Sequence, residues 1–363
     1  MSKDDDIKRE ELLRIANLVR PALAAQAYIP ALTHISFDGR SATTFNDISA
    51  ISVRCPLDVK RLIPGELMIR ALGSFNAESV LMQEDKDGAV VISSGRSKVK
   101  LPTLALDKFP LTLPEGKASE IALTAGIMAG IKQCLISVGA DPTHPAQMGV
   151  TLDVDGKGRA VLYSTDNFTI SRYQTNEEIE LPGDAPVILP TFFCEQLVRL
   201  ASAFPRAEAA LLLRPGALIA EFGNDLATLF SKTLVDLEPL DFPKIIKQHV
   251  DLVELTDLLS DIPAGFDAAL DRALLVLSQE PDKATSLECS GDRITMESSS
   301  ALGDSTDRFS FKSEEVKRFK VDPVHLARAV KSCAKMAPLP RVLVLADEKA
   351  QFIHLVAHVV QGK

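Results

Sequence analysis

The stretch LPTFFCEQLVRLASAF (189–204), with ALLLRPGALIAEFG (210–223) after it, decides the fold of this chain. In the first stretch, apolar residues recur with helical spacing directly after a proline, and proline suits the first turn of a helix. In the second stretch, two apolar runs flank a Pro-Gly pair, which predicts a β-hairpin. A helix that starts at a proline and leads into a hairpin is therefore the local unit from which the rest of the sequence can be interpreted.

The same unit occurs three times along the chain. The first copy starts at IPGELMIRALGSF (63–75), and the third starts at VDPVHLARAVKSCAKM (321–336). Each is followed by apolar or alternating runs, SVLMQEDKDGAVVISSG (79–95) and RVLVLADEKAQFIHLVAHVV (341–360), which predict hairpins. The distance between successive copies is the size of a domain and much longer than a solenoid repeat, so the pattern predicts separate domains.

A second unit, a longer helix followed by another hairpin, recurs in the same order. Its helices are predicted over residues 9–23, 123–139 and 266–278. Two helices and two hairpins in each repeat predict an α+β domain, with both helices on one side and two antiparallel β-meanders on the other. We therefore expect three similar domains, which span residues 1–117, 118–245 and 246–363.

The composition indicates an ordinary globular protein. With 363 residues, of which 46% are hydrophobic and 25% charged, the chain has enough apolar mass for several cores. No apolar run is long enough to span a membrane, and the first residues, MSKDDDIKREELL (1–13), lack the apolar core of a secretory signal. Five cysteines are scattered without a paired spacing, which suits a reducing compartment, so we expect a cytoplasmic protein.

Motifs for common catalytic chemistry are not found in the sequence. The six histidines show no metal-binding spacing and the glycine-rich nucleotide-binding patterns are missing, so no metal and no cofactor is expected. Ser164, Thr165 and Asp166 are adjacent, which is the wrong geometry for a catalytic triad, and Asp166 is expected to cap a turn. The net charge of −9 argues against DNA binding over the whole surface, but it leaves room for one positive face.

Four segments between residues 29 and 246 carry a family resemblance. They are IPALTHISF (29–37), ISSGRSKVKLPTLALDKFP (92–110), MGVTLDVDGKGRAVLYSTDNFTISRY (148–173) and LDFPKII (240–246). Together with the threefold repeat, they resemble the bacterial sliding clamp family, the β subunit of the replicative DNA polymerase. The resemblance implies that two chains close head-to-tail into a ring, with sheets on the outside and helices around a hole for duplex DNA.

The function implied by the resemblance is that of a non-enzymatic processivity factor. The implied partners are double-stranded DNA, which the ring encircles without reading its sequence, the replicative DNA polymerase, a clamp loader, other proteins with a clamp-binding peptide, and a second copy of the chain. No cofactor and no membrane partner is implied. The rival hypothesis is a clamp-like protein that sequesters replication partners without encircling DNA, and an enzyme that depends on Asp166 is a third.

The turn in YSTDNFTISRY (163–173) matches the family segment that forms one wall of a hydrophobic cleft, where partners insert a short peptide of the Gln-x-x-Leu-x-Phe type. The family's Gly-His-Arg-Leu reads Asn-Phe-Thr-Ile here, and its C-terminal Met-Pro-Met-Arg-Leu is replaced from Ala357 to Gln361, so a remodelled cleft is expected. The alternative is that Phe168 and Ile170 are ordinary strand core. The resemblance assigns these residues to the cleft: Gln147, Thr165, Asn167, Phe168, Thr169, Ile170, Pro243, Ile245, Leu355 and Ala357.

The resemblance also implies that the helices face DNA, so they are expected to carry Lys and Arg while the hairpins carry the acids. The alternative is that these cations simply cover solvated helix faces. Some family DNA contacts are replaced, since an expected arginine is Gln26 and an expected tyrosine pair is Pro145–Ala146. The candidate DNA-facing residues are Arg14, Arg20, Gln26, Lys132, Arg199, Arg272, Arg328 and Lys331.

The ring contact is expected between the first domain of one chain and the third domain of the other. The strand within SGRSKVKL (94–101) is implied to pair edge to edge there, and the end of the helix in RALLVLS (272–278) is implied to face it. Alternating lysines are also typical of a strand edge that is protected against pairing. The candidate interface residues are Arg96, Lys98, Lys100, Leu101, Val276 and Leu277.

Overall fold

The computed structural model describes residues 7–233, 237–312 and 316–359. Two sequence predictions fall partly outside these ranges. One is the interpretation that the first residues lack a secretory signal, because residues 1–6 are not described. The other is the departure from the family pattern at the C-terminal end, because the description stops at Val359. Among the described helices, none combines the length and the apolar character needed to cross a membrane.

The chain divides into two compact units. Unit 1 contains residues 1–124 and 195–235, and unit 2 contains residues 125–194 and 236–363. The segment expected to form the middle domain, 118–245, is thus shared between the two units. The division into three domains remains a prediction, and the sheets described below explain why the middle segment is shared.

Unit 1 consists of antiparallel sheets and the helices beside them. Its helices are α1 (Arg9–Val19), α2 (Gly65–Ser74) and most of α4 (Thr191–Ala203), with short 3-10 turns over Arg20–Ala22, Pro30–Thr33 and Leu106–Lys108. Its strands are β1 (Ile7–Lys8), β2 (His34–Asp38), β3 (Ser41–Phe45), β4 (Ser49–Arg54), β5 (Lys60–Pro64), β6 (Ser79–Glu84), β7 (Val90–Ser94), β8 (Ser97–Leu101), β9 (Leu104–Ala105), β10 (Ser119–Ala122), β15 (Ala209–Arg214), β16 (Ala217–Phe222) and β17 (Ala227–Lys232).

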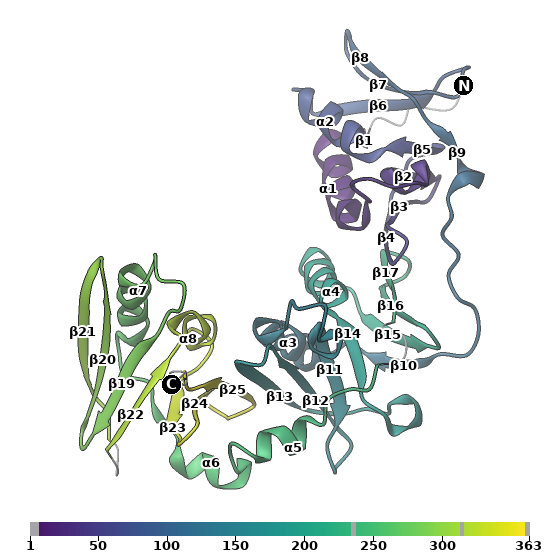
Figure 1. The fold of residues 1–363 in the computed structure, drawn as a ribbon. Helices are drawn as coiled ribbons and strands as arrows, with labels where there is room; N and C mark the ends of the chain where they lie inside the picture. Colours follow the sequence, from purple (N-terminus) through teal and green to yellow (C-terminus); the bar gives the residue numbers. More distant parts are fainter. Residues whose placement is uncertain (1–6, 234–236, 313–315, 360–363) are drawn as a thin grey trace. The chain divides into compact units, whose positions relative to one another are not determined.

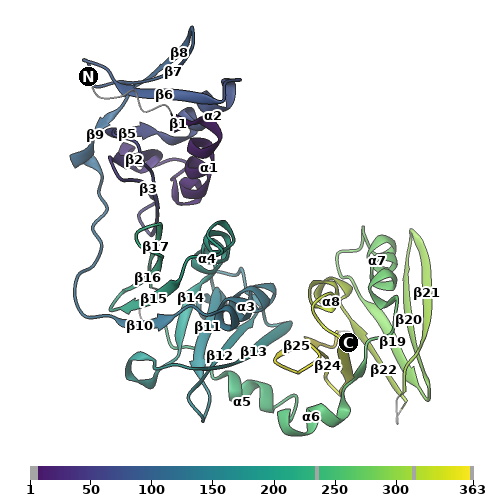
Figure 2. The same cartoon turned by 180° about the vertical axis from the view of Figure 1, so that it is seen from behind.

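The long sheet of unit 1 combines strands that are far apart in the sequence. Its order is β10-β15-β16-β17-β4-β3-β2-β5-β9, and the pairing of β17 with β4 joins the middle segment to the first repeat (Figure 1). The second sheet has the order β1-β6-β7-β8, so β8 is an edge strand. Helices α1 and α2 lie side by side in both views (Figures 1 and 2).

Unit 2 is built in the same way. Its helices are α3 (Ala125–Cys134), the start of α4, α5 (Phe242–Lys247), α6 (Leu252–Leu258), α7 (Phe266–Val276) and α8 (Pro323–Val330), with 3-10 turns over Leu135–Ser137, Pro145–Gln147 and Pro182–Asp184. Its strands are β11 (Gly149–Val154), β12 (Arg159–Thr165), β13 (Thr169–Glu178), β14 (Val187–Pro190), β18 (Ser260–Asp261), β19 (Thr285–Ser290), β20 (Arg293–Ser300), β21 (Gly303–Ser310), β22 (Lys317–Val321), β23 (Lys335–Pro338), β24 (Val342–Ala346) and β25 (Phe352–Ala357).

The long sheet of unit 2 again crosses a repeat boundary. Its order is β14-β11-β12-β13-β25-β24-β23-β18, and the pairing of β13 with β25 joins the middle segment to the third repeat. The other sheet has the order β21-β20-β19-β22, which leaves β21 as an edge strand. Because each half of the middle segment extends a neighbour's sheet, the middle segment has no sheet of its own, and this is why it is shared between the units.

The helices expected from the sequence are present. The prolines Pro64, Pro190 and Pro323 each lie at or directly before the start of a helix, namely α2, α4 and α8. The longer predicted helices are found as α1, α3 and α7, with the last residues of the first two in 3-10 turns. Helices α5 and α6 were not expected. Each starts at an aspartate whose side chain accepts a backbone N–H, Asp241 for Lys244 and Asp251 for Val253.

The core of the third repeat shows how the layers are held together. Helices α7 and α8 pack against each other and bury Leu270 and Leu326. These side chains lie in one apolar cluster with Leu287, Ile294 and Phe319 from the β19–β22 sheet. Each fully buried leucine or isoleucine contributes about 1.5–3 kcal/mol to the free energy of unfolding, so this cluster fixes the helices on the sheet.

Candidate partner-binding cleft

The turn between β12 and β13 is held by one carboxylate. Asp166 Oδ1 accepts hydrogen bonds from the backbone N–H of Phe168 at 3.1 Å and of Thr169 at 2.7 Å, and from Thr169 Oγ1 at 2.8 Å. Asn167 has a φ of 72°, a left-handed conformation that asparagine tolerates better than most residues. The expectation that Asp166 caps this turn is confirmed, and the carboxylate sets the shape that the turn presents to solvent.

Two further cleft candidates stabilise the same turn. Gln147 Nε2 donates to Asn167 Oδ1 at 2.6 Å, although Gln147 comes from the 3-10 turn before β11. Thr165 Oγ1 donates to the carbonyl oxygen of Thr169 at 2.7 Å and accepts from the backbone N–H of Asn167 at 3.2 Å. Gln147, Thr165 and Thr169 are buried, and buried polar groups need such partners. The structure therefore brings these four predicted residues together.

The seam between β13 and β25 continues the candidate cleft. Ile170 and Leu355 are paired across the two strands, and the backbone N–H of Ala357 donates to the carbonyl oxygen of Phe168 at 2.9 Å. Leu355 is only 1% exposed, whereas Ile170 is half-buried. Leu355 lies in a buried apolar cluster, and Ile170 packs against that cluster from a partly exposed position. The alternative that Phe168 and Ile170 are strand core fails for Phe168, which is 62% exposed, whereas the position of Ile170 is compatible with both interpretations.

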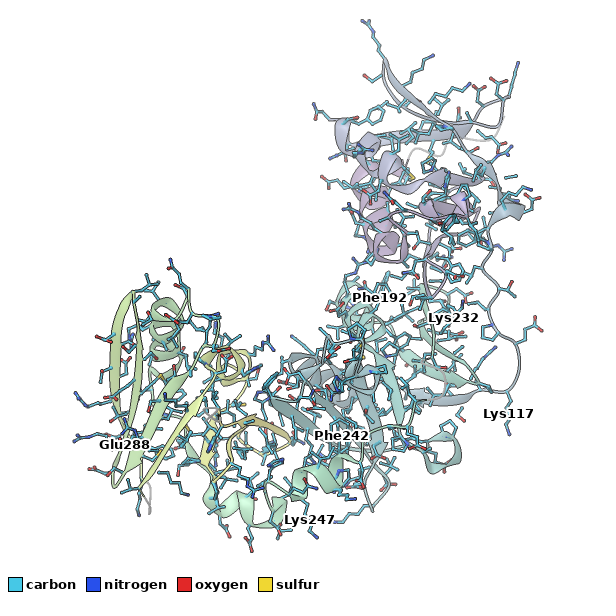
Figure 3. All side chains as sticks on the ribbon, in the orientation of Figure 1. Lys117, Phe192, Lys232, Phe242, Lys247 and Glu288 are labelled. Carbon is cyan, nitrogen blue, oxygen red and sulfur yellow. The ribbon has the colours of Figure 1, made fainter. Side chains whose placement is uncertain are left out.

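Helix α5 borders the same apolar surface. Phe242, labelled in Figure 3, stacks on Tyr163 with ring centroids 5.0 Å apart and an angle of 4° between the planes. Phe242 and Ile246 are buried in the apolar cluster that contains the seam residues. Pro243 is exposed and Ile245 is half-buried on this helix. All the predicted cleft residues therefore lie in unit 2: Gln147 is in the 3-10 turn before β11, and the others are on the Asp166 turn, the seam or α5.

Helix α8 places residues beside the candidate cleft that the sequence did not predict there. The ring of His325 stacks on that of Phe168, and His325 Nδ1 lies 3.8 Å from Asp166 Oδ2. At the other nitrogen of the imidazole, His325 Nε2 lies 3.9 Å from Asp322 Oδ2. Arg328 also approaches the turn, with its Nη1 3.6 Å from Asp166 Oδ2. Asp322, His325 and Arg328 follow one another at three-residue spacing, which places them on one helix face, and this pattern was the available signal. Phe168 remains 62% exposed.

A buried polar network lies under the turn. Thr169 Oγ1 donates to Ser137 Oγ at 2.9 Å, and Ser137 Oγ lies 2.8 Å from Ser171 Oγ. Ser171 Oγ lies 3.0 Å from Nδ1 of His354, which is fully buried in β25. Burial, together with the neighbouring His325, lowers the pKa of His354 to about 3, so this ring is neutral at ordinary pH. The network links the cleft turn to the seam through uncharged groups.

The surroundings of the cysteines do not favour the thiolate form that a reactive nucleophile needs. The thiols of Cys55, Cys134, Cys194 and Cys289 are buried, and that of Cys333 is half-buried. Burial raises the pKa of Cys55 and of Cys333 to about 12 and that of Cys289 to about 11. Within the described ranges, no group of three or more His, Cys, Asp or Glu side chains is placed to hold a metal ion.

Most arginines proposed to face DNA are engaged by acids of the same chain. The expected separation of basic helices from acidic hairpins is incomplete. Helices α1, α2 and α4 contain equal numbers of acidic and basic residues. Helix α7 has one more acidic than basic residue, whereas α3 and α8 each have one basic residue and no acidic one. The ion pairs are Arg14 with Glu11 at 2.8 Å, Arg20 with Glu66 at 2.7 Å, Arg272 with Asp307 at 2.5 Å and Arg328 with Asp166 at 3.6 Å.

The remaining DNA-facing candidates differ in their surroundings. Arg199 is partly buried and donates from Nη2 to the carbonyl oxygens of Asn17 and Leu18, and burial lowers its pKa. Lys132, Lys331 and Gln26 are exposed. Neither lysine has an ion pair among the described residues, so these two are the candidates that are best able to meet a phosphate.

The interface candidates lie on or beside the edge strand β8 and at the end of α7. On the edge strand β8, Lys98 is exposed and Lys100 Nζ contacts carboxylates of the β6–β7 turn, while Leu101 is buried. Arg96 is exposed in the turn before β8. At the end of α7, Leu277 is buried and Val276 is half-buried; Leu275, which was not predicted, is 72% exposed. The exposed apolar side chain at the end of α7 is thus Leu275, next to the predicted Val276 and Leu277.

Comparisons with known proteins agree with this geometry. The chain is 21% identical over 269 residues to the beta sliding clamp of Chlamydia muridarum, which covers 70% of this chain and 72% of that protein. A sliding clamp from Bartonella birtlesii, solved bound to griselimycin, matches with a TM-score of 0.85 at 14% identity, and a DNA polymerase III beta subunit from Thermotoga maritima matches with a TM-score of 0.82 at 15% identity. Each covers 98% of this chain and 99% of the solved chain. No protein-family model matches.

The chain therefore has the sliding-clamp fold that the family resemblance implied, with the mixture of helices and antiparallel sheets that the sequence predicted. The resemblance stated from the sequence is confirmed at low identity: the chain is similar in sequence to a beta sliding clamp and similar in fold to solved DNA polymerase III beta subunits.

Proposed function

We propose that this chain is a DNA sliding clamp, a non-catalytic processivity factor that encircles duplex DNA in the cytoplasm and tethers the replicative DNA polymerase. The observation that carries the proposal is the apolar surface at the seam of β13 and β25, bordered by the Asp166 turn and by α5. This surface is built from the residues that the family resemblance assigns to the partner cleft. The fold comparisons support the same function.

The proposed partners of the cleft are the polymerase, a clamp loader and other proteins that carry a short peptide with large apolar side chains. Ile170 and the exposed Phe168 provide apolar contact area at the surface, and the buried Leu355 and Phe242 make that surface firm. Anchor side chains that enter such an apolar surface dominate the free energy of binding, whereas the surrounding contacts mainly exclude water.

A peptide titration tests the cleft. A fluorescein-labelled synthetic peptide of the Gln-x-x-Leu-x-Phe type is titrated with the wild type and with Ile170→Asp, followed by fluorescence polarisation. We expect affinity to fall at least tenfold, because a carboxylate at the edge of an apolar surface opposes burial of leucine or phenylalanine. Leu67→Asp, an exposed leucine on α2, is the matched control. An unchanged affinity in a folded Ile170→Asp protein would remove the cleft assignment.

The proposed ring is a head-to-tail homodimer in which β8 of one chain pairs with β21 of the other. Charge on the two free edges favours this pairing: β8 presents the exposed Lys98, and β21 presents the exposed Asp304. Pairing would also cover the free edges of β8 and β21, where backbone groups are otherwise unpaired. Leu275 at the end of α7 and Leu302 in the β20–β21 turn are exposed and would add apolar area.

The second candidate function, sequestration of replication partners without encircling DNA, is favoured by the charge of the helices. Four of the candidate arginines already have carboxylate partners, so little positive charge is left to attract a phosphate backbone. Two measurements separate the alternatives. Light scattering over a dilution series reports whether a two-chain species persists, and retention on nicked circular DNA compared with linear DNA reports whether the DNA is enclosed. Retention on the circular form alone supports the ring.

A further inference from the structure

The turn of the candidate cleft has a structural copy in unit 1. Between β3 and β4, Asn46 Oδ1 accepts hydrogen bonds from the backbone N–H of Ile48 at 3.1 Å and of Ser49 at 2.8 Å. Asp47, in the middle of this turn, has a φ of 80°. These are the interactions that Asp166 makes in the other turn, where Asn167 holds the left-handed position. The sequences FNDIS (45–49) and TDNFT (165–169) therefore fold in the same way with different side chains.

The copy also lies at an equivalent seam. The backbone N–H of Lys232, the last residue of β17, donates to the carbonyl oxygen of Ile48 at 2.9 Å. In unit 2, Ala357 at the end of β25 makes the same bond to Phe168, also at 2.9 Å. The seam residues are paired in matching register as well, since Ser49 lies opposite Ser231 just before that bond. Ile48 thus holds the place in unit 1 that Phe168 holds in unit 2.

An apolar cluster lies at this seam. Phe45 and Phe230 contact each other with ring centroids 6.4 Å apart, and both belong to a buried cluster with Ala217 and Ile219 of β16. Part of this cluster is covered by the connection between β9 and β10, from which Phe109 and other apolar side chains pack against it. In unit 2, α5 covers the corresponding cluster through Phe242, and in both cases the covering segment carries a Phe-Pro pair.

The rim of this cluster carries exposed apolar side chains. Ile48 is 60% exposed, close to the value for Phe168. Tyr28 and Ile29 are exposed directly after Ala27, whose side chain packs against the cluster, and Leu113 is exposed in the connection that covers it. Scattered single hydrophobic residues are common on protein surfaces, but several around one apolar cluster mark an interaction site.

We propose that this seam, with Ile48 at its rim, is a second docking site for an extended peptide with large apolar side chains two positions apart. The chain itself shows which chemistry the cluster accepts. Phe109 and Leu111, two positions apart, both pack against it, and Phe109 has an extended backbone. In an extended segment, residues two apart point to the same side, so a partner peptide with this spacing can place both side chains on one surface.

The test rests on the proposed function only for its probe. The fluorescein-labelled Gln-x-x-Leu-x-Phe peptide is titrated calorimetrically into wild type, Ile48→Asp, Ile170→Asp, the double variant and the control Leu67→Asp. We expect the wild type to bind two peptides per chain, each single variant to bind one, and the double variant to bind none. Because Ile48 is mostly exposed, Ile48→Asp is expected to keep the melting temperature of the wild type, and Ile48→Ser provides a second, uncharged variant.

The outcomes separate the two proposals. One peptide per chain in the wild type, lost in Ile170→Asp and unchanged in Ile48→Asp and Ile48→Ser, would overturn the second site and leave the cleft in place. Binding that is lost in Ile48→Asp and unchanged in Ile170→Asp would support the unit 1 site and overturn the cleft. No binding to the wild type would overturn both.

Discussion

The rings of Phe168 and His325 are stacked, with centroids 5.7 Å apart and an angle of 19° between their planes. One face of the phenylalanine is therefore covered by the imidazole, while the side chain as a whole stays 62% exposed. His325 is itself placed between Asp166 and Asp322. The aromatic ring is thus oriented before any partner arrives, which lowers the entropic cost of using it as an anchor.

We expect Phe168→Ala to weaken binding of the Gln-x-x-Leu-x-Phe peptide by about tenfold, the size expected for loss of a contributing aromatic anchor. The melting temperature is expected to stay unchanged, because the ring is mostly exposed. Polarisation titrations of the variant and of Leu67→Ala give the comparison. Equal affinity of Phe168→Ala and wild type would show that the ring lies outside the occupied part of the cleft.

The salt dependence of DNA binding is expected to be shallow. Lys132 and Lys331 are the DNA-facing candidates without an ion pair among the described residues, and each phosphate contact contributes a slope of about −0.9 in log K against log salt concentration. A ring of two chains is then expected to show a slope of about −4 or shallower. Titrations of a short duplex at several salt concentrations measure it.

The matched variants for this measurement are Lys331→Ala and Arg272→Ala. Lys331→Ala is expected to flatten the slope by about two for the two-chain ring, because each chain loses one contact. Arg272→Ala is expected to change it little, since its guanidinium is already held by Asp307. A steep slope that depends on Arg272 would contradict this account of the helix charges.

The edge pairing between β8 and β21 is tested by reversing charge. Lys98→Glu is expected to weaken the dimer by about tenfold, because it places like charges on two strands that pair directly. Adding Asp304→Lys in the same chain reverses both edges and is expected to restore most of the lost affinity. Sedimentation equilibrium of the two single variants and the double variant decides the point. If all three behave as the wild type does, these edges do not meet.

The buried His354 predicts a loss of stability in acid. Its pKa is about 3 in the folded protein and about 6.5 when unfolded, so the unfolded chain takes up a proton that the folded chain refuses. The stability that depends on a neutral His354 is fully present above about pH 6.5. As the pH drops from there towards 3, the free energy of unfolding falls by about 1.4 kcal/mol for each pH unit. Urea unfolding between pH 7 and pH 4 measures it.

The variant His354→Asn isolates this effect. It keeps a polar group near Ser171, and although its overall stability is lower, its stability should depend less on pH between 6.5 and 4 than that of the wild type. The exposed His144→Gln is the control and is expected to keep the wild-type dependence. Parallel pH curves for wild type and His354→Asn would mean that the imidazole takes up its proton in the folded state.

The sequence was sufficient for the features that depend on local pattern. The prolines at the starts of α2, α4 and α8, the apolar spacing of the helices and the Asp166 turn all act over a few residues, and each was predicted correctly. What the sequence did not reveal depends on register between distant segments. Whether His325 lies over Phe168 is set by how α8 packs beside the β13–β25 seam, and no short-range rule determines that packing. Helices α5 and α6 were missed because they are short, so the helical spacing of their apolar residues is too weak to predict them from the sequence.

The pairing of β13 with β25 has a consequence for synthesis on the ribosome. Strand β13 is made long before its partner, which lies near the end of the described chain. During that interval the newly made β13 has a free, partly apolar edge, and such an edge can pair with another nascent chain. Completion of unit 2 therefore has to wait until β25 has been made, and slow translation of the third repeat would prolong the period in which the protein is exposed to misassembly.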